Sequence, residues 1–469
     1  MAITLTALEV GLLVLGVCGT VLLWVRPLLL EWVDVAAYVG RALILALSCV
    51  VSFYYNDLYD MRKVKSFGEF SARLLQSLGI LLILMTAFYA LFPDLQLAKI
   101  AFLSSLLALA GLVLLLRAAL YTMMKARGFT ERVLILGTGP LALKIAAEIE
   151  AAPHHGYSVI GFVEDSEPLP LGTSSLQRYP TLGRLEGLEK ITEEFHPNRL
   201  VVALAERRAR LPVHQLLHMR MKGIMVEDGI EVYKRLAGKL AVESLMPSYL
   251  IFSRDFEKPR WQRALHRAIS LTVAAVGLLI TWPLMGMIAL LIKLDSKGSV
   301  FFVQERLGYG ELSFRLVKFR TMHPVNQATS EWVRDNSDRI TRVGKWLRRF
   351  RLDELPQFLN ILRGDMNLVG PRPHPVSNRE LFAAKIPYFS LRHMVRPGIT
   401  GWAQVRHGYA NDLEEEIEKI RYDLYYIKHM SLWFDLLIIF DTVKIVLFGR
   451  GSKEADAYWT NSPVGAGKQ

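Results

Sequence analysis

The sequence predicts a protein of three folded parts: a membrane α-helical bundle, an α/β Rossmann-like domain, and a mainly α membrane-associated domain with a re-entrant helix. Three observations support this fold class. Four apolar runs fill residues 1–120, β-rich and helical patterns alternate over residues 130–250, and a fifth apolar run precedes a basic block rich in Gly and Pro. A chain of 469 residues is long enough for two or three such units, each with its own core.

The N-terminal part, residues 1–120, is predicted to be a four-helix transmembrane bundle. Its apolar runs cover residues 10–25, 35–55, 74–91 and 100–116. Each run is close to the length that crosses a hydrocarbon core of about 30 Å, and the hydrophobic fraction of 52% exceeds that of a typical soluble protein. Arg41 interrupts the second run. A set of buried helices in a soluble protein is the alternative interpretation.

Basic residues gather after the second and fourth runs, and they set the predicted orientation. They are Arg62, Lys63, Lys65 and Arg73, followed by Arg117, Lys125, Arg127 and Arg132. Because cytoplasmic loops are enriched in Lys and Arg, we expect both loops and the N-terminus in the cytoplasm. The start of the chain lacks the basic segment, short apolar core and cleavage site of a removable signal peptide.

The net charge of +12 indicates anionic partners, which are nucleic acid, acidic lipid headgroups or phosphate-bearing substrates. For the partners we expect membrane lipid and phosphate-bearing substrates, and no nucleic acid. The two cysteines, Cys18 and Cys49, both lie inside apolar runs. They therefore offer neither a disulfide framework nor a Cys-based metal site, and a reducing cytosol fits best.

The middle part, residues 130–250, is predicted to be a Rossmann-like domain with a parallel sheet and crossover helices. A strand over 132–137 opens onto a G-x-G-x-x-A sequence that contains Gly137 and Gly139. These glycines allow a tight turn and let a phosphate approach the next helix N-terminus. A second strand ends at Glu164 and Asp165, where a ribose-binding acid is expected. The domain either binds a nucleotide, or is vestigial or regulatory with glycines that serve only the turn.

The fifth apolar run, residues 268–292, is predicted to be the centre of a re-entrant helical hairpin over 263–293. Arg260, Arg263 and Arg267 precede the run and Lys293 and Lys297 follow it, so both ends carry the cytoplasmic signature. Pro283 lies inside the run, where it removes a backbone donor and bends or breaks the helix. An ordinary fifth span is the alternative.

Asp353 and Glu354 are the candidate catalytic pair of the basic block that follows. Asp353 stands before Glu-Leu-Pro, which is also the pattern of a helix N-cap with proline in the first turn. Three cations just upstream, Arg348, Arg349 and Arg351, keep a carboxylate ionised and can hold phosphate oxygens. An ionised carboxylate can attack a phosphoryl centre, and its neighbour Glu354 can then hold a divalent cation.

Three further basic residues of this block, Lys318, Arg320 and Arg372, are candidates for holding phosphate groups. Phosphoryl transfer depends mainly on positioning and charge neutralisation, so Mg²⁺ together with several Arg or Lys groups is the expected equipment. The alternative is that these residues form a solvated basic face at the membrane surface.

From Arg263 to about Gly449 the chain resembles the bacterial sugar transferases, the monotopic polyprenyl-phosphate hexose-1-phosphate transferases. The matching elements are the Pro-containing apolar helix, Leu294-Asp-Ser296, Gln304-Glu-Arg306, Lys318-Phe-Arg-Thr-Met322, Leu352-Asp-Glu-Leu-Pro356, Gly364-Asp-Met366, Gly370-Pro-Arg-Pro373 and Pro397-Gly-Ile-Thr-Gly-Trp402. The N-terminal part resembles the long members of this family, which carry four spanning helices and a CoA-binding-like Rossmann domain. One departure is Trp282 before Pro283, where the family often has serine.

The resemblance implies a phosphotransferase that moves hexose-1-phosphate from a UDP-sugar to undecaprenyl phosphate and releases UMP. Asp353 would form a covalent phosphosugar intermediate and Glu354 would bind Mg²⁺. Phosphate and nucleotide contacts would come from Gln304, Arg306, Lys318, Arg320, Arg348 and Arg372. The catalytic domain would span 294–449, at the cytosolic face of the bacterial inner membrane, and would start exopolysaccharide, capsule or O-antigen synthesis. The sugar is left open, and a homo-oligomer is possible.

Two other function classes would also combine membrane helices with a Rossmann-like domain. A membrane-tethered nucleotide-sugar dehydratase or epimerase would need Tyr-x-x-x-Lys after the glycine loop, but the pairs Tyr59/Lys63 and Tyr121/Lys125 both lie upstream of it. A non-enzymatic nucleotide sensor would leave the Asp-Glu pair and the arginines unexplained.

Two C-terminal segments carry structural predictions only. Residues 433–448 suit an amphipathic helix at the membrane interface that keeps Asp435, Asp441 and Lys444 in water. A buried core helix or a sixth span are the alternatives. The tail, residues 450–469, is predicted to be flexible.

Overall fold

The chain forms two compact units, Met1–Gly229 and Ile230–Gln469, and each is described by itself. The computed structural model describes residues 11, 14–16, 19, 32–59, 67–125, 130–151, 156–164, 179–204, 211–242, 256–323, 339–408 and 412–448. Most of the first predicted span, residues 10–25, and all of the predicted flexible tail, residues 450–469, lie outside these ranges.

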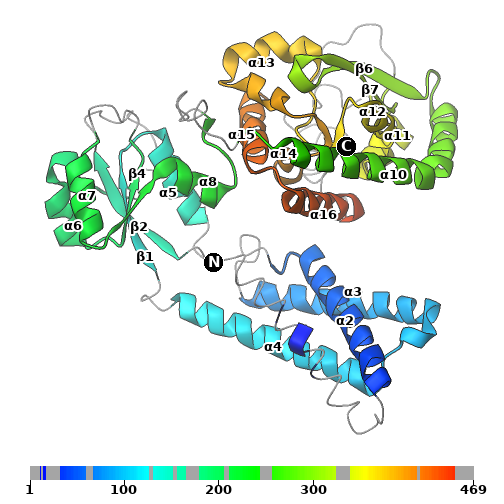
Figure 1. The fold of residues 1–469 in the computed structure, drawn as a ribbon, viewed down its shortest axis with the longest axis horizontal. Helices are drawn as coiled ribbons and strands as arrows, with labels where there is room; N and C mark the ends of the chain where they lie inside the picture. Colours follow the sequence, from blue (N-terminus) through cyan, green and yellow to red (C-terminus); the bar gives the residue numbers. More distant parts are fainter. Residues whose placement is uncertain are drawn as a thin grey trace, which may run out of the picture. The chain divides into compact units, whose positions relative to one another are not determined.

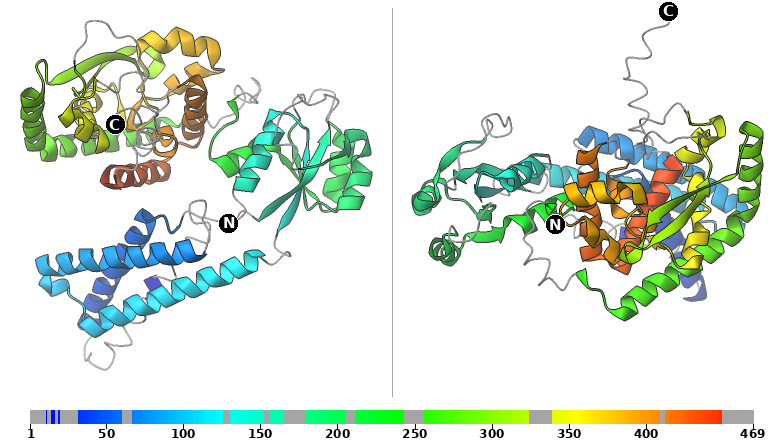
Figure 2. Two further views of the ribbon diagram at one scale, coloured as in Figure 1. Left: turned by 180° about the vertical axis from the view of Figure 1, so that it is seen from behind. Right: turned by 90° about the horizontal axis from the view of Figure 1, so that it is seen from above.

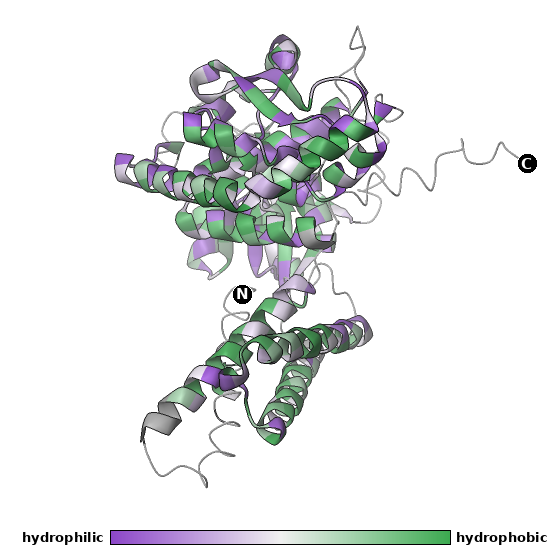
Figure 3. Ribbon diagram, turned by 90° about the vertical axis from the view of Figure 1, so that its right-hand side faces the viewer, coloured by the Kyte–Doolittle hydropathy of each residue, from purple (hydrophilic) through white to green (hydrophobic). Residues whose placement is uncertain are grey.

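Three long apolar helices follow one another in the first unit (Figure 1). They are α2 (Trp32–Tyr55), α3 (Phe67–Leu91) and α4 (Lys99–Lys125), with a short 3₁₀ turn η1 (Pro93–Leu95) between the last two. Hydrophobic residues dominate these helices (Figure 3), and stretches of all three are long and apolar enough to cross a membrane. Large apolar side chains such as Leu75 and Ile83 are exposed on their outer faces, as lipid-facing positions require. The prediction of long apolar helices is confirmed for these three, and each is a candidate membrane span.

The rest of the first unit is a five-stranded parallel sheet with the order β3-β2-β1-β4-β5. Its elements are β1 (Glu131–Leu136), α5 (Pro140–Ala151), β2 (Tyr157–Glu164), β3 (Thr181–Arg184), η4 (Leu185–Gly187), α6 (Leu188–Phe195), β4 (Arg199–Val202), α7 (Val213–Met221) and β5 (Met225–Asp228). Helices α6 and α7 pack on one face of the sheet, and α5 covers the other (Figures 1 and 2). This arrangement confirms the predicted Rossmann-like fold.

Close packing at the end of β1 requires glycine at position 137. Its φ of +108° lies in the region that glycine favours, and a Cβ there would come within 2.7 Å of the Ala203 carbonyl oxygen. Glycine is therefore needed whether or not a ligand binds. Gly139 lies just before α5, and Glu164 faces Arg184 at 3.9 Å, while Asp165 falls outside the described residues. Nucleotide binding by this domain stays a prediction.

The second unit takes in the end of the range predicted as the Rossmann-like domain. The residues that follow helix α8 (Gly229–Ala237) pack on α15 (Leu413–His429) of the second unit. The Leu240 amide donates to the Arg421 carbonyl at 3.0 Å, and Lys239 pairs with Glu418. Leu240 belongs to the same hydrophobic core as residues of α15.

Helix α10 (Arg260–Asp295) is the long apolar element of this unit, and it is long enough to cross a membrane. It is a single bent helix with Pro283 inside it, not two helices joined by a turn (Figures 1 and 2). Proline removes one backbone donor, so the helix can bend there while the adjacent turns stay intact. The Thr281 hydroxyl donates to the Gly277 carbonyl at 2.7 Å, which also favours bending next to Pro283. A re-entrant path of this helix through the membrane stays a prediction.

The other elements of this unit build a mixed domain in which short helices alternate with short strands. They are β6 (Phe301–Leu307), η7 (Tyr309–Glu311), β7 (Ser313–Phe319), α11 (Arg342–Arg349), η9 (Leu352–Glu354), α12 (Gln357–Arg363), β8 (Asn367–Val369), η10 (Val376–Asn378), α13 (Arg379–Lys385), η11 (Phe389–Met394), β9 (Gly398–Thr400), α14 (Trp402–Arg406), α15 and α16 (Leu432–Phe448). Strands β6 and β7 form an antiparallel hairpin, and β8 pairs with β9 in parallel.

Helix α16 corrects one prediction about its polar residues. Asp435 accepts hydrogen bonds from Tyr426 and contacts His266 at 2.6 Å, and Lys444 is buried. The exposed side chains of this helix are apolar and include Trp433 and Phe440. The polar residues therefore face the interior and tie α16 to α10 and α15, while apolar residues face outward. The prediction that Asp435 and Lys444 stay in water is wrong, because they find polar partners or burial inside the domain.

Candidate active site

The Asp353–Glu354 pair lies on the short turn η9, between α11 and α12. Arg351, just before it, has a φ of +55°, and this left-handed residue turns the chain so that both carboxylates point inward. Asp353 is 8% exposed and Glu354 is 5% exposed. Helix α12 begins at Gln357 after the N-cap residue Pro356, and among the described residues no side chain caps its N-terminus. The helix-cap alternative for Asp353 is therefore excluded.

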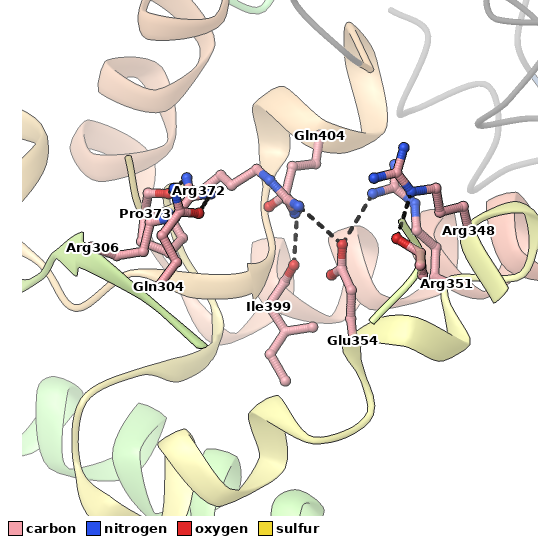
Figure 4. A network of polar contacts seen from close by, with 10 residues as sticks. Gln304, Arg306, Arg348, Arg351, Glu354, Arg372, Pro373, Ile399 and Gln404 are labelled. Atoms are coloured by element: carbon pink, nitrogen blue, oxygen red, sulfur yellow. Dashed lines mark hydrogen bonds and ion pairs between the residues drawn. The ribbon is translucent and has the colours of Figure 1, made fainter. Parts of the chain in front are cut away.

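Glu354 is held by two arginines from different parts of the chain. Its Oε1 atom accepts hydrogen bonds from Arg351 Nη1 at 3.2 Å and Arg372 Nη2 at 3.1 Å. Figure 4 shows the carboxylate between these two guanidinium groups. Burial alone would raise the pKa of Glu354, but the positive charges of Arg372 and Arg351 outweigh it and hold the pKa below its usual value. Glu354 is therefore ionised at neutral pH.

Asp353 has the opposite environment, although it is the next residue. Within the described part of the chain, no donor forms a hydrogen bond with its buried Oδ1 atom. Burial and the adjacent Glu354 charge raise the pKa of Asp353 to about 6, while Lys318, Arg351 and Arg348 act against this rise. A buried carboxylate oxygen without a donor is costly in a folded protein, and such groups are found at reactive sites.

Lys318 and Arg348 bring positive charge to Asp353 from two other elements. Lys318 lies on β7, is half-buried, and places its Nζ atom 5.0 Å from the centre of the Phe302 ring. Burial and the neighbouring cation Arg306 lower the pKa of Lys318 to about 8, and Asp353 acts against this lowering. Arg348, at the end of α11, donates through Nε to the Thr321 hydroxyl at 2.9 Å.

The segment that carries Arg372 is fixed on both sides by side chains from other elements. Arg306 on β6 donates to the Pro373 carbonyl at 3.1 Å and also to Gln304 (Figure 4). Arg392 donates to the Arg372 carbonyl at 2.8 Å and to the Asp423 carboxylate at 2.7 Å. These bonds set the position of the Arg372 backbone, from which its guanidinium reaches Glu354.

Comparisons with known proteins agree with this geometry. Residues 261–449 match the bacterial sugar transferase family, and residues 55–219 match a CoA-binding domain. The chain is 33% identical to a UDP-glucose:undecaprenyl-phosphate glucose-1-phosphate transferase of Klebsiella pneumoniae, over 80% of this chain and 82% of that protein. It is equally similar to the Escherichia coli K12 protein of the same name, over 68% of each chain. This chain belongs to the bacterial sugar transferase family.

Another relative is more similar but is matched over a shorter region. This protein is a UDP-N-acetylgalactosamine-undecaprenyl-phosphate N-acetylgalactosaminephosphotransferase of Aeromonas hydrophila, 47% identical over 188 residues. The match covers 40% of this chain and 44% of the relative. An undecaprenyl-phosphate glucose phosphotransferase of Komagataeibacter xylinus is matched over 62% of its length. The chain therefore spans less than two thirds of these two sugar transferase relatives.

The structure brings together most of the site residues that the sequence predicts for a bacterial sugar transferase. Glu354 bonds to Arg372, and the charges of Lys318 and Arg348 act on Asp353. Gln304 and Arg306 lie beside the same segment as Arg372 and support it.

Arg320 has a different position, although it follows Lys318 closely in sequence. It is buried, and its Nη2 atom donates to the Ser296 carbonyl and hydroxyl oxygens at the end of α10. Its observed contacts therefore hold the turn between α10 and β6.

Sequence reasoning missed three residues that this sugar transferase fold brings into or beside the site. Arg351 was recognised only as a neighbouring cation, yet it bonds directly to Glu354. Arg392 lies on η11 and Gln404 on α14, far from the Asp-Glu pair in sequence. The only sequence signal for Gln404 is its place two residues after the motif Pro397–Trp402, and nothing in the sequence distinguishes Arg392.

Proposed function

We propose that this protein transfers hexose-1-phosphate from a UDP-sugar to undecaprenyl phosphate and releases UMP. The observation that carries the proposal is the Asp353 carboxylate, which is buried, has an Oδ1 atom with no donor among the described residues, and lies under the influence of three cations. Relatives named as glucose and N-acetylgalactosamine phosphotransferases acting on undecaprenyl phosphate support the substrate class.

The reaction proceeds in two displacements at one phosphorus atom. An oxygen of ionised Asp353 attacks the β-phosphorus of the UDP-sugar, a carboxyl oxygen–phosphorus bond forms, and the bond from that phosphorus to the bridging oxygen breaks. UMP leaves with the electron pair of that bond. A phosphate oxygen of undecaprenyl phosphate then attacks the same phosphorus and expels the Asp353 carboxylate, which returns to its starting state.

The neighbouring residues divide the remaining work. Lys318 and Arg348 offset the negative charge of the diphosphate and of the phosphoryl group in transfer. Arg351 and Arg372 keep Glu354 ionised and fixed next to the nucleophile. The lowered pKa of Lys318 also makes this cation sensitive to alkaline pH.

We propose that Mg²⁺ binds beside Glu354 together with the substrate. Within the described residues, no group of three or more His, Cys, Asp or Glu side chains is arranged to hold a metal. Mg²⁺ commonly binds through one or two carboxylates together with substrate phosphates and water, so Glu354 with the diphosphate would suffice. When bound, the ion neutralises phosphate charge.

The membrane placement agrees with a lipid-linked acceptor. Leu279, Ile280 and Trp282 are strongly exposed on α10, and apolar side chains of α16 are exposed as well. We propose that these surfaces contact lipid and that the site opens at the cytosolic face of the bacterial inner membrane, where UDP-sugars are available. The product would then start an exopolysaccharide, capsule or O-antigen chain.

The test is an isotope-exchange assay on the purified full-length protein with Mg²⁺. Labelled UMP should exchange into UDP-sugar in the absence of lipid, because the first displacement is reversible. Addition of undecaprenyl phosphate should then give net UMP release. A panel of UDP-glucose, UDP-galactose and their N-acetylated forms identifies the sugar.

The Asp353→Asn variant is the control, and it should lose both the exchange and the release. Exchange that persists in this variant would rule out the covalent step. Release of UDP instead of UMP would rule out phosphosugar transfer altogether, and conversion of the sugar without lipid would indicate an epimerase.

A further inference from the structure

Gln404 and Arg372 lie in segments that follow the carboxyl ends of two paired parallel strands, β8 and β9. Strand β8 runs directly into Gly370-Pro-Arg372, and β9 runs into Gly401 and helix α14, which carries Gln404. The carboxyl ends of parallel strands lie at one edge, where ligands commonly bind in such sheets. Figure 4 shows the Gln404 side chain in the same region as Arg372 and Glu354.

The segments that follow β8 and β9 approach each other unusually closely at this edge. A Cβ on Gly401 would lie 2.2 Å from the Gly370 carbonyl oxygen and 3.2 Å from Gln404 Oε1. Gly401 therefore keeps the space beside the Gln404 amide open, and it places that amide next to the segment that leads to Arg372.

The orientation of the Gln404 amide is fixed by its other end. Its Nε2 atom donates to the Ile399 carbonyl at 2.8 Å. Because a carbonyl only accepts, the nitrogen must face Ile399 and Oε1 must point away from it. The side chain is 9% exposed, and in the part of the chain that the structure describes no donor reaches the buried Oε1.

Helix α14 cannot easily turn this acceptor toward another partner. Trp402, at the start of α14, donates through Nε1 to the Gly238 carbonyl at 2.8 Å. Its ring also packs against Phe434 with a centroid distance of 4.9 Å. A buried acceptor that is held in place without a donor is rare and destabilising, and a bound ligand is one of the reasons it persists.

We propose that Gln404 Oε1 accepts a hydrogen bond from the nucleotide-sugar, so that Gln404 is a substrate-binding residue. The inference rests on the proposed function. The donor is an N–H or O–H group of the substrate, which means either the imide of the uracil base or a hydroxyl of the sugars. Undecaprenyl phosphate is excluded as the source, because its phosphate is an acceptor at neutral pH.

Gln404→Met in the full-length protein tests this assignment, because methionine fills the same volume without an acceptor. The KM for the UDP-sugar should rise about fivefold to tenfold, as expected for one lost hydrogen bond, while the KM for undecaprenyl phosphate stays unchanged. Gln404→Asn is the second variant. It keeps the amide but is one carbon shorter, so it cannot serve Ile399 and the substrate together and should shift the same KM.

Asn360→Leu is the matched control. Asn360 is a fully buried amide whose Nδ2 donates to the Arg315 carbonyl at 2.7 Å and whose Oδ1 accepts from Val317 N at 3.1 Å. Its loss should lower the melting temperature and leave both KM values unchanged. The inhibition constant of UMP then locates the donor: a parallel rise in Gln404→Met places it on the nucleotide, and no rise places it on the hexose.

Two results would overturn the inference. One is an unchanged KM for the UDP-sugar in both Gln404 variants. The other is an equal rise in the KM for both substrates with a lower melting temperature, which would indicate a structural role. UMP release by the wild-type protein tests the proposed function separately, so the two hypotheses can fail independently.

Discussion

Replacement of Asp353 by asparagine should stabilise the protein while it abolishes turnover. Burial and Glu354 raise the pKa of Asp353 from 3.8 to about 6, so ionisation of this carboxyl costs free energy in the folded state. Each pKa unit corresponds to about 1.4 kcal/mol, and the cost at pH 7 is therefore about 3 kcal/mol. Asparagine has nearly the same shape and no charge, so it removes this cost. Turnover should fall roughly 10³-fold or more, as for other lost nucleophiles.

The stability difference between Asp353→Asn and the wild type should depend on pH. A carboxyl whose folded-state pKa lies above its unfolded value destabilises the fold increasingly as pH rises from about 4 to about 6, and by a constant amount above that. The melting temperature of Asp353→Asn should therefore exceed that of the wild type by roughly 6–12 °C at pH 7 and match it near pH 4.

Thermal unfolding of both proteins in detergent, without substrate or Mg²⁺, measures this difference. Glu354→Gln is the informative comparison. Glu354 is held by two arginines, so this substitution should lower the melting temperature of the protein. A difference between Asp353→Asn and wild type that is independent of pH, or a variant less stable than the wild type at pH 7, would refute the electrostatic reasoning.

Three further predictions follow from the same site and its surroundings. Turnover should fall as pH decreases through about 6, where Asp353 gains a proton. It should also fall as pH increases through about 8, where Lys318 loses a proton. A flat profile from pH 5 to 9 would contradict both assignments. Arg392→Met should lower stability by about 3–5 kcal/mol because it leaves the buried Asp423 unpaired, and adding Asp423→Leu should restore much of the loss in melting temperature. If α10 is re-entrant, single cysteines at its exposed ends should both react with a membrane-impermeant thiol reagent from the cytosolic side in a cysteine-free background; reaction from opposite sides would establish a fifth span.

The fold followed from patterns that are local in sequence, and the errors arose where a neighbour decides the outcome. Apolar length indicated the spanning helices, and alternating strand and helix patterns indicated the parallel sheet. Pro283 predicts a bent or broken helix, and α10 is one helix with this proline inside it, while its path through the membrane stays a prediction. The close packing of α10 on α12 could not be predicted from the sequence, because it depends on Gly277, where a Cβ would lie 2.9 Å from the Phe358 ring. For α16, the 3.6-residue period indicated an amphipathic helix but did not show which side faces inward.

The site shows the same limit in its basic residues. Lys318 and Arg320 are two residues apart, so a continuous strand would place both on one face. Strand β7 ends at Phe319, and Arg320 turns back to the end of α10. Gln404 reaches the site only because β8 and β9 pair in parallel, and a three-residue strand pair leaves little trace in one sequence.

The two adjacent carboxylates have different environments, and this difference explains why the site contains cations beyond the two arginines that pair with Glu354. Glu354 takes two guanidinium groups for itself, while Asp353 accepts no hydrogen bond at Oδ1 from the described residues and is neutral at mildly acidic pH. An incoming diphosphate would raise the pKa of Asp353 further and favour its protonated form, which cannot attack, unless positive charge compensates. Lys318 and Arg348 supply that charge before the substrate arrives. Burial and the neighbouring cations, Arg306 foremost, lower the pKa of Lys318, and an anionic substrate relieves the repulsion among these cations when it binds. The same electrostatic arrangement therefore favours substrate binding and keeps Asp353 able to attack.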